Sequence, residues 1–400
     1  MLKVAAVDNP VSRFENGNII LRNVAFTCSN QALEIAISGS KISGIKKLAA
    51  PAEWICLPPL VDKHVHANRA FTLAGIKPDS FQNAIALTAE LLKNFNAEQY
   101  CFHARQLFQR AYSHGTTGIR THADIDRHTR FNAVQGTLDA KATMAGEMDI
   151  EVVAFASSRL DPASADGKSM IREGVARGAD LIGAAPALYP DPGRSIDAVI
   201  ELAIEQDVAV DLHQDEHLIP DRASIDYLAD ATISNGCQGR ITLSHGCVLS
   251  VLEAEIRNRI IEKLAQAQIE VVVLPTTNLY LQDRRQGTPE RRGLTCVHEM
   301  LNAGIAVRIA SDNVCDAFYP YGDADLLDIA YIAMLAAQLD ATGDLVKTLC
   351  DGRVKPAVND TADMVLVKGQ NFDDILSRRP GERIIIREGE PFRLHQQSLH

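Results

Sequence analysis

Apolar residues gather along the middle of the chain in short runs rich in valine, isoleucine and leucine, separated by polar turns. The runs lie at 60–66, 118–124, 150–156, 180–187, 208–213, 240–245, 269–275 and 305–312. Between them, segments such as 97–113, 195–206 and 251–267 place apolar residues at i, i+3, i+4 and i+7, the period of an amphipathic helix. Strand and helix alternating over about 250 residues predict a parallel (β/α)8 TIM barrel, with a doubly wound open sheet as the alternative.

The two ends of the chain follow a different pattern. Residues 18–56 alternate apolar and polar positions between turn residues, and the tail repeats this at 362–367 and 383–390. Such alternation is typical of short antiparallel strands with one buried face. Neither end could bury much apolar surface alone, so we predict that they pair into one small β-sandwich domain. The predicted division assigns 1–56 and 351–400 to this domain and 57–350 to the barrel.

Composition narrows the classes of partner. The chain has 400 residues and a formal net charge of −11, which argues against binding to nucleic acid or to an anionic membrane. It favours action on a neutral or cationic small molecule. The N-terminus lacks an apolar segment of signal-peptide length, no run reaches the length of a membrane span, and the eight cysteines include no CxxC pair. We therefore predict a cytoplasmic protein with reduced thiols.

Histidine and aspartate stand at the ends of several predicted strands. His64 and His66 end the first run, His213 the fifth, His245 the sixth and Asp312 the eighth. Side chains two apart on a strand point the same way, and the carboxyl ends of barrel strands surround one mouth, where barrel enzymes keep their active sites. A lone HxH pair arises by chance, but chance does not keep five such groups in this register. We predict a metal site, since imidazole and carboxylate together suit zinc or iron(II).

Glu216 follows His213 by three residues and therefore falls on the loop beyond the fifth strand, where it can lean over the metal. A carboxylate there can move a proton from water to a ring nitrogen and then to the leaving amine. The alternative role is that of an acid at a helix N-terminus, for which Asp215 is the better candidate. His122 and Asp124, at the end of the second run, are interpreted mainly as hydrogen-bonded structural groups.

The segment Pro-Pro-Leu-Val-Asp-Lys-His-Val-His at 58–66 resembles the opening motif of the amidohydrolase superfamily. Further segments resemble bacterial cytosine deaminase, in order along the barrel. They include Gly-Ile-Arg-Thr-His-Ala-Asp at 118–124, Asp-Leu-His-Gln-Asp-Glu at 211–216, Thr-Leu-Ser-His at 242–245 and Ser-Asp-Asn-Val-Cys-Asp-Ala-Phe-Tyr-Pro at 311–320. The resemblance covers roughly residues 55–340 and is specific, because several ordered motifs agree.

The resemblance implies one divalent metal ion, zinc or iron(II). No lysine ends the fourth run, where members with two metals carry a bridging group. The implied metal ligands are His64, His66, His213 and Asp312. Glu216 is implied as the catalytic proton shuttle, while His245 and Asp312 would stabilise the tetrahedral centre. Members of the family often assemble, so a homo-oligomer is expected from the resemblance alone.

The substrate pocket departs from the cytosine deaminase pattern. Gln282 and Phe318 fall where the family lines this pocket. Ser157, however, stands where cytosine deaminase has a glutamine, and Asn313 replaces the second of two adjacent aspartates. A serine hydroxyl makes fewer hydrogen bonds than a glutamine amide, and unmet polar groups in a pocket discriminate strongly between substrates. We predict these four residues as substrate contacts and a natural substrate other than cytosine.

These features predict a metal-dependent amidohydrolase that deaminates a small amino-substituted nitrogen heterocycle with water and releases ammonia. Candidate rings are cytosine-like pyrimidines, isocytosine, isoguanine, creatinine and pterins. One alternative is release of an alkylamine from an N-substituted triazine, or opening of a cyclic amide. Relatives of the alkylamine-releasing type lack a glutamate at the position of Glu216. The other alternative, a catalytically silent metal-binding scaffold, is disfavoured by a full ligand set with Glu216 beside it.

Overall fold

The computed structural model describes residues 9–14, 17–73, 77–284 and 288–393. They form two compact units. One contains the described residues of Met1–Val61, Ser113–Thr117 and Asp340–His400, and the other those of Asp62–Tyr112 and Gly118–Leu339. Two eight-stranded sheets organise the chain.

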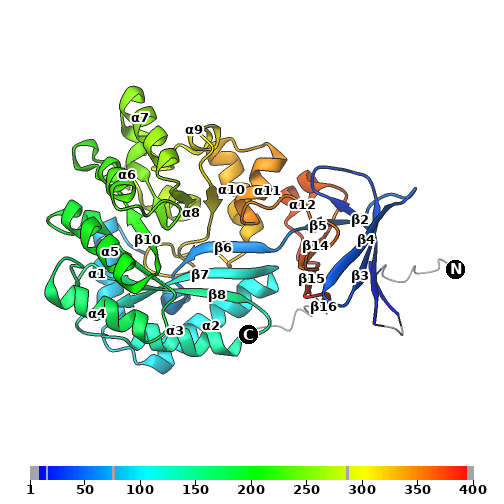
Figure 1. The fold of residues 1–400 in the computed structure, drawn as a ribbon, viewed down its shortest axis with the longest axis horizontal. Helices are drawn as coiled ribbons and strands as arrows, with labels where there is room; N and C mark the ends of the chain where they lie inside the picture. The colour runs from blue at the N-terminus through cyan, green and yellow to red at the C-terminus, as the bar shows by residue number, and fades with distance from the viewer. Residues whose placement is uncertain (1–8, 15–16, 74–76, 285–287, 394–400) are drawn as a thin grey trace. The chain divides into compact units, whose positions relative to one another are not determined.

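The first sheet is a parallel barrel, in which each strand pairs with the next one in the sequence (Figure 1). Its strands are β6 (Leu60–Val65), β7 (Thr116–Ile125), β8 (Asp149–Ala156), β9 (Leu181–Ala184), β10 (Ala209–Gln214), β11 (Ile241–His245), β12 (Glu270–Val273) and β13 (Val307–Ile309). A parallel bridge between Val65 and Asp312 connects the end of β6 to the segment after β13 and closes the circle. Every predicted run overlaps one of these strands, so the predicted (β/α)8 barrel is confirmed. The eighth strand is shorter than predicted, since it ends at Ile309 and not at Asp312.

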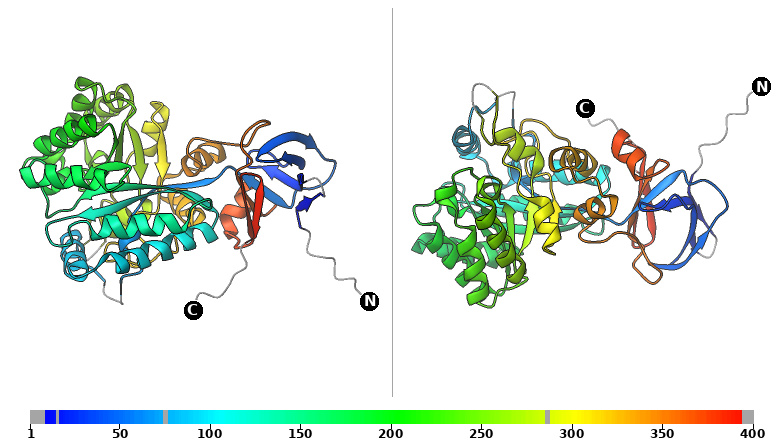
Figure 2. Two further views of the ribbon diagram at one scale, coloured as in Figure 1. Left: turned by 60° about the horizontal axis from the view of Figure 1, so that its bottom comes forward. Right: turned by 90° about the horizontal axis from the view of Figure 1, so that it is seen from above.

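Helices surround the strands of the barrel (Figure 2). They are α1 (Phe81–Leu92), α2 (Ala97–Ser113), α3 (Asn132–Thr143), α4 (Ala165–Ala176), α5 (Pro192–Gln206), α6 (Ile225–Ser234), α7 (Ala254–Gln266), α8 (Pro275–Leu281), α9 (Val297–Asn302) and α10 (Leu326–Ala337). Short 3-10 turns follow several strands: η1 (Ala67–Arg69), η2 (Pro186–Leu188), η3 (Pro220–Arg222) and η4 (Cys247–Val251). The helical segments predicted at 97–113, 195–206 and 251–267 correspond to α2, α5 and α7.

Helix α5 shows how the sequence sets an element. Asp191 caps its first turn by accepting a hydrogen bond from the Arg194 amide, and Pro192 occupies the first helical position, where no amide hydrogen is needed. The helix ends at Asp207, which adopts a left-handed φ of 52°. Its apolar face, with Ile196 and Val199 fully buried, packs against β9 and β10. Local capping and the apolar stripe therefore agree with the barrel topology.

The second sheet draws strands from both ends of the chain, in the order β16-β15-β14-β5-β2-β3-β4, with β1 paired to β2. The bounds are β1 (Val11–Arg13), β2 (Ile19–Phe26), β3 (Leu33–Ser38), β4 (Lys41–Lys47), β5 (Trp54–Leu57), β14 (Met364–Lys368), β15 (Arg383–Arg387) and β16 (Glu390–Arg393), with α11 (Thr342–Leu349) and α12 (Phe372–Arg378) in the same unit. One apolar cluster joins residues of both ends, among them Ile35, Trp54, Met364 and Ile386. The predicted β domain built from the two flanks is confirmed.

The pairing in this sheet is mixed, whereas the sequence pattern indicated antiparallel strands only. Strand β5 runs parallel to β2, while the other strand pairs described in this sheet are antiparallel. The reason is topological: the β2-β3-β4 meander occupies one edge of β2, and β5 returns to the other edge.

The eight cysteines are free thiols, four of them buried. Among the described residues, no helix combines the length and the apolar character that crossing a membrane requires.

Gly183 in β9 is a point where the barrel leaves no room for a side chain. A Cβ there would lie 2.5 Å from the backbone oxygen of Asp211 and 2.8 Å from a methyl of Val153. We expect Gly183→Ala to lower the free energy of unfolding by about 1–3 kcal/mol, as overpacked cores do. Scanning calorimetry of the metal-free protein measures this. Gly44→Ala, at a strand glycine with open space around it, is the control and should leave stability unchanged or raise it.

Candidate active site

Barrel closure brings three of the predicted metal ligands together. His64 lies in β6 and His66 directly beyond it, while Asp312 follows β13. The Asp312 amide donates to the His64 carbonyl at 2.8 Å, and the His66 amide donates to the Asp312 carbonyl at 3.0 Å. These two backbone bonds fix the first and last strand segments side by side, so the side chains share one end of the barrel.

His213, from β10, completes the cluster. Its Nε2 lies 3.0 Å from Nε2 of His66, and Oδ1 of Asp312 lies 3.4 Å from the same His66 atom. Nε2 of His64 lies 3.7 Å from Asp312 Oδ1. The four residues each offer one ligand atom, and these atoms all lie within 4.8 Å of one another. The structure therefore brings together all four residues that the sequence predicted as ligands.

The donor set fits a divalent cation. Nε2 of His64 and both carboxylate oxygens of Asp312 are buried and take part in no hydrogen bond with the described residues. Nε2 of His66 and Nε2 of His213 face each other, and one proton at most can lie between them. Unmet buried polar atoms are costly. One ion with imidazole and carboxylate ligands would satisfy one buried atom of each of the four residues.

Burial also sets the protonation of the ligands. It lowers the pKa of His64 to about 3 and the pKa values of His66 and His213 well below their usual range. The three rings are therefore neutral and present lone pairs, the form that binds metal. Burial raises the pKa of Asp312 to about 8, and the positive charge of Arg69 opposes that shift.

Glu216 lies two residues beyond β10, beside His245. Its Oε1 is 3.5 Å from Nδ1 of His245. Burial raises the pKa of Glu216 well above its usual range, and the Asp312 carboxylate adds to this shift. The neighbouring Asp215 has a different role, since its carboxylate accepts the amide hydrogens of Ser224 and Ile225 at the start of α6. Glu216 is thus the acid of this loop that faces the cluster.

His245 ends β11 with a left-handed φ of 75°, an uncommon backbone state that clusters at functional sites. The amide nitrogen of Asn278, in α8, lies 3.0 Å from its Nδ1. An amide nitrogen only donates, so Nδ1 is the acceptor and Nε2 carries the hydrogen. Nε2 is buried and has no hydrogen-bond partner among the described residues. His245 is therefore arranged to donate a hydrogen bond from Nε2.

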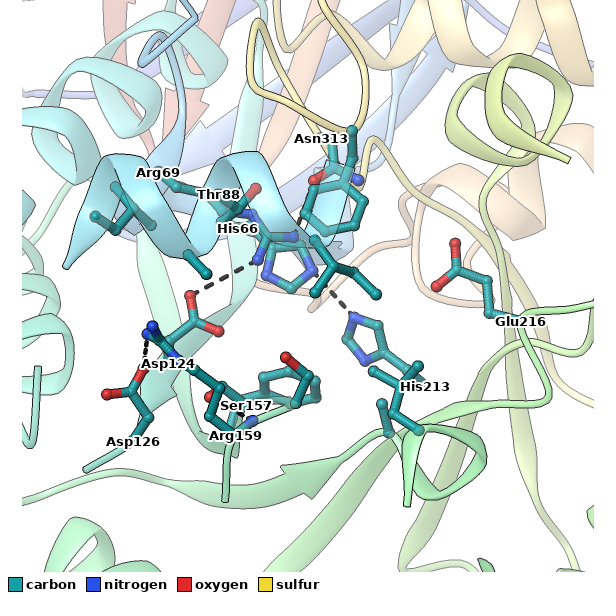
Figure 3. Close-up of a pocket in the computed structure, with 18 of the residues that line it drawn as sticks. His66, Arg69, Thr88, Asp124, Asp126, Ser157, Arg159, His213, Glu216 and Asn313 are labelled. Atoms are coloured by element: carbon teal, nitrogen blue, oxygen red, sulfur yellow. Dashed lines mark hydrogen bonds and ion pairs between the residues drawn. The ribbon is translucent and has the colours of Figure 1, made fainter. Parts of the chain in front are cut away.

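A cavity with about 750 Å³ of empty space, part of it open to solvent, lies over the cluster. Figure 3 shows Glu216 and His213 on one side of it and Asp124, Asp126 and Arg159 on the other. Three of the four predicted substrate contacts line it: Ser157, Asn313 and Phe318. Gln282 is not among the described residues that line it. Its side-chain amide donates to the backbone oxygen of Glu216 at 3.3 Å and so supports the Glu216 loop.

Sequence reasoning did not single out Arg69, which links several pocket residues. Its Nε donates to Asp316 at 3.1 Å and its Nη2 to Asn313 Oδ1 at 3.1 Å, while the guanidinium lies 4.6 Å from the Phe318 ring centroid. Asp124, interpreted mainly as structural, accepts from the Asn68 amide at 3.0 Å and also lines the cavity. The sequence signal for Asp124 was its place at the end of β7. Arg69 lies in a turn, where the sequence has no periodicity that would show which way a side chain points.

Zinc or iron(II) added to the metal-free protein is expected to raise Tm. An ion that binds only the folded state stabilises it by about 4 kcal/mol when its free concentration is 1,000-fold above Kd. Scanning calorimetry with and without metal measures the shift. His66→Gln should remove most of it, whereas His298→Gln, which changes a histidine bonded to the Gln338 carbonyl outside the cluster, should keep it. An equal shift in the His66→Gln protein would place metal binding elsewhere.

Comparison with known proteins gives concordant matches. A family model described as "Amidohydrolase family" matches residues 82–337. The pterin deaminase of Rhizobium rhizogenes is 29% identical over 352 residues, covering 83% of this chain and 79% of that protein. The N-isopropylammelide isopropyl amidohydrolase of Pseudomonas sp. (strain ADP) is 29% identical over 345 residues, covering 82% of each. In structure, 5-methylcytosine deaminase from Klebsiella pneumoniae, liganded with 5-fluorocytosine, has a TM-score of 0.84 at 21% identity, covering 95% of this chain and 98% of that one; the likeness shows the shared fold.

Proposed function

The chain belongs to the amidohydrolase family, and from this premise we propose that it is a metal-dependent hydrolytic deaminase of a small amino-substituted nitrogen heterocycle. The observation that carries the proposal is the Glu216 carboxylate, whose side chain is only 11% exposed and which lines the same cavity as His66, His213 and Asp312 and lies beside His245. A proton acceptor, a hydrogen-bond donor and a cation site converging on one pocket suit addition of water to an electron-poor ring carbon.

His64, His66, His213 and Asp312 would hold the cation. When bound, it supplies Lewis-acid activation that makes water reactive near neutral pH. Glu216 takes a proton from the attacking water and delivers it to the ring nitrogen next to the amino-bearing carbon. The new carbon–oxygen bond leaves a tetrahedral centre, whose oxygen accepts a hydrogen bond from His245 Nε2 and lies beside Asp312. A second proton, lost from that oxygen, passes to the amino group; the carbon–nitrogen bond breaks, ammonia leaves and a ring carbonyl remains.

Ser157, Asn313 and Phe318 are proposed as substrate contacts, and the two polar ones are already engaged. Ser157 Oγ accepts the Arg159 amide hydrogen at 3.3 Å, and the Asn313 side-chain amide donates to Thr277 at 3.2 Å. These bonds fix their orientation toward the cavity. The pterin deaminase relative supports a ring larger than a single pyrimidine, among candidates that include cytosine-like pyrimidines, isocytosine, isoguanine and creatinine.

Release of an alkylamine from an N-substituted triazine is the second candidate. It is favoured by the amidohydrolase relative from Pseudomonas, which is as similar to this chain as the pterin deaminase is. The Glu216 carboxylate beside the cluster favours deamination instead. Opening of a cyclic amide would use the same site.

We also propose zinc or iron(II) as the ion, because both suit imidazole with carboxylate. We propose a cytoplasmic location and a homo-oligomeric state as well. The net charge of −11 supports a small-molecule partner rather than nucleic acid.

The test is a substrate screen with protein loaded with zinc or iron(II). Cytosine, isocytosine, isoguanine, creatinine, pterin and N-isopropylammelide are incubated with it, and ammonia and isopropylamine are measured separately. Ammonia from an aminated ring supports the proposal, and isopropylamine from N-isopropylammelide supports the second candidate. No product from any ring, with the metal shown to be bound, would contradict both and favour a silent metal-binding scaffold.

A further inference from the structure

A chain of polar side chains lies in the barrel interior below the proposed metal ligands. It consists of Ser244 from β11, Asp211 from β10 and Arg120 from β7, and all three are buried. Barrel interiors are normally filled by branched apolar residues. A buried polar network is costly unless every member is hydrogen-bonded. The network therefore calls for a reason beyond packing.

The hydrogen bonds of this network have a fixed direction. Ser244 Oγ lies 2.7 Å from Asp211 Oδ1 and donates its single hydrogen there. The same oxygen lies 2.8 Å from Nδ1 of His64. Because the hydroxyl hydrogen is committed to Asp211, Oγ can only accept from His64. Nδ1 of His64 must then carry the hydrogen.

Arg120 secures the other end. Its Nη1 donates to Asp211 Oδ2 at 3.1 Å and to Thr242 Oγ1 at 3.0 Å, and its Nε donates to Glu151 at 2.9 Å. A guanidinium is always charged and only donates. Each oxygen of Asp211 therefore faces a donor, Oδ2 the Arg120 guanidinium and Oδ1 the Ser244 hydroxyl, and the serine hydrogen points away from His64.

We propose that Ser244 and Asp211 are positioning residues that hold His64 in the Nδ1–H tautomer and thereby aim its Nε2 lone pair at the cation. Nε2 is the atom that lies 3.7 Å from Asp312 Oδ1 and takes part in no hydrogen bond with the described residues. The inference rests on the metal site of the proposed function. It explains why the His64 imidazole directs Nε2 toward the cation, because hydrogen-bond partners behind a metal ligand fix its tautomer and orientation.

His122 lies close enough to Asp211 to suggest a second role for that carboxylate, as a metal ligand. Its Nε2 lies 3.4 Å from Asp211 Oδ1, and its ring centroid lies 4.0 Å from that of His64. His64, His122 and Asp211 could themselves hold a cation. However, both oxygens of Asp211 already accept hydrogen bonds, from Ser244 and Arg120, which argues for a positioning role.

The first test reads the tautomer directly. Ring-nitrogen NMR shifts of isotope-labelled histidine are recorded for the metal-free protein, with the His64 signals assigned from a His64→Gln variant. We expect a protonated Nδ1 and an unprotonated Nε2 for His64 in the wild type. A protonated Nε2 would overturn the proposal. This measurement needs only the assignment variant, so it decides the matter even where a Ser244 variant fails to fold.

The second test measures metal affinity by competition with a chelator. Ser244→Ala and Asp211→Asn should bind zinc about 10- to 100-fold more weakly, the usual effect of losing such a partner. Ser244→Thr keeps the hydroxyl and should restore most of the affinity. Thr242→Val is the matched control, since it removes a hydrogen bond from the same Arg120 but none from His64. It should lower stability and leave zinc affinity within about 2-fold of the wild type, a difference worth well under 1 kcal/mol.

Unchanged zinc affinity in both Ser244→Ala and Asp211→Asn would overturn the proposal. So would a stoichiometry of two zinc ions that falls to one in His122→Gln, because the carboxylate would then be a ligand itself. The two tests measure the tautomer of His64 and the affinity for zinc, and neither depends on a reaction product. A substrate screen without product would therefore contradict the proposed function and leave this inference intact. Substrate turnover with unchanged zinc affinity in these variants would contradict the inference and leave the proposed function intact.

Discussion

Glu216→Gln is expected to lower kcat for ammonia release by about 100- to 10,000-fold, the contribution typical of a positioned proton-transfer group. Glutamine has nearly the same shape, so it can keep the place of Glu216 beside His245, where Oε1 lies 3.5 Å from Nδ1. It cannot take a proton from water or return one to a ring nitrogen. Metal content should stay at the wild-type level, because Glu216 is not among the four clustered ligands.

Steady-state ammonia release and metal analysis of the same preparation check this expectation. Asp215→Asn is the matched control: the adjacent residue also carries a carboxylate, but that carboxylate caps α6 through Ser224 and Ile225. It should reduce stability, since a lost cap costs about 1 kcal/mol, and leave kcat within a few-fold. Unchanged turnover in the Glu216→Gln protein would remove Glu216 from the mechanism.

The barrel was predictable because each strand leaves a local signal. His245 is the last residue of β11, His64 and His213 lie one residue before the ends of β6 and β10, and the carboxyl ends of parallel barrel strands meet at one mouth. The positions of the proposed ligands therefore follow from the strand positions without any knowledge of long-range packing. Asp312 differs, since β13 ends at Ile309 and this proposed ligand lies three residues further on. Its place is secured instead by backbone bonds to His64 and His66.

The network behind His64 was not predictable from strand alternation. Ser244 and His245 are adjacent in the sequence, and an ordinary strand would point them to opposite faces. Both nevertheless face the site: Ser244 bonds His64, and His245 lies beside Glu216. The left-handed φ of 75° at His245 turns the chain as β11 ends. Such a backbone state is set by tertiary packing, which no period in the sequence encodes.

The mixed sheet and the turn residues were missed for a related reason. Strand β5 pairs in parallel with β2, and the choice of partner depends on which edge the β2-β3-β4 meander leaves open. Arg69 contacts Asp316 and Asn313, which lie more than two hundred positions away in the chain. Contacts of this kind appear only when the barrel closes.

Asp312→Asn is expected to have the second large effect. It should lower the melting temperature relative to the wild type when metal is present, but not when metal is absent. Asparagine matches the carboxylate in shape and tolerates the left-handed φ of 62° found at this position. It is a neutral and much weaker ligand. Zinc affinity should fall by at least about 100-fold, the upper end of what loss of a partner behind a ligand costs. Turnover should fall below that of the Glu216→Gln protein, because the cation and an acid at the tetrahedral centre are lost together.

The melting temperature distinguishes loss of a metal ligand from general misfolding of the variant. In the metal-free protein, burial raises the pKa of Asp312 to about 8. Folding at neutral pH therefore requires this carboxyl to take up a proton at a cost in free energy, and a neutral amide removes that cost. Asp312→Asn should therefore melt at the same temperature as the metal-free wild type or higher, and well below the metal-loaded wild type. Asp316→Asn is the contrasting control. Asp316 is paired with Arg69 at 3.1 Å, and breaking a buried pair costs about 3–5 kcal/mol whether or not metal is present. If Asp312→Asn instead destabilises the metal-free protein as Asp316→Asn does, Asp312 is a structural residue and the metal site lacks its carboxylate ligand.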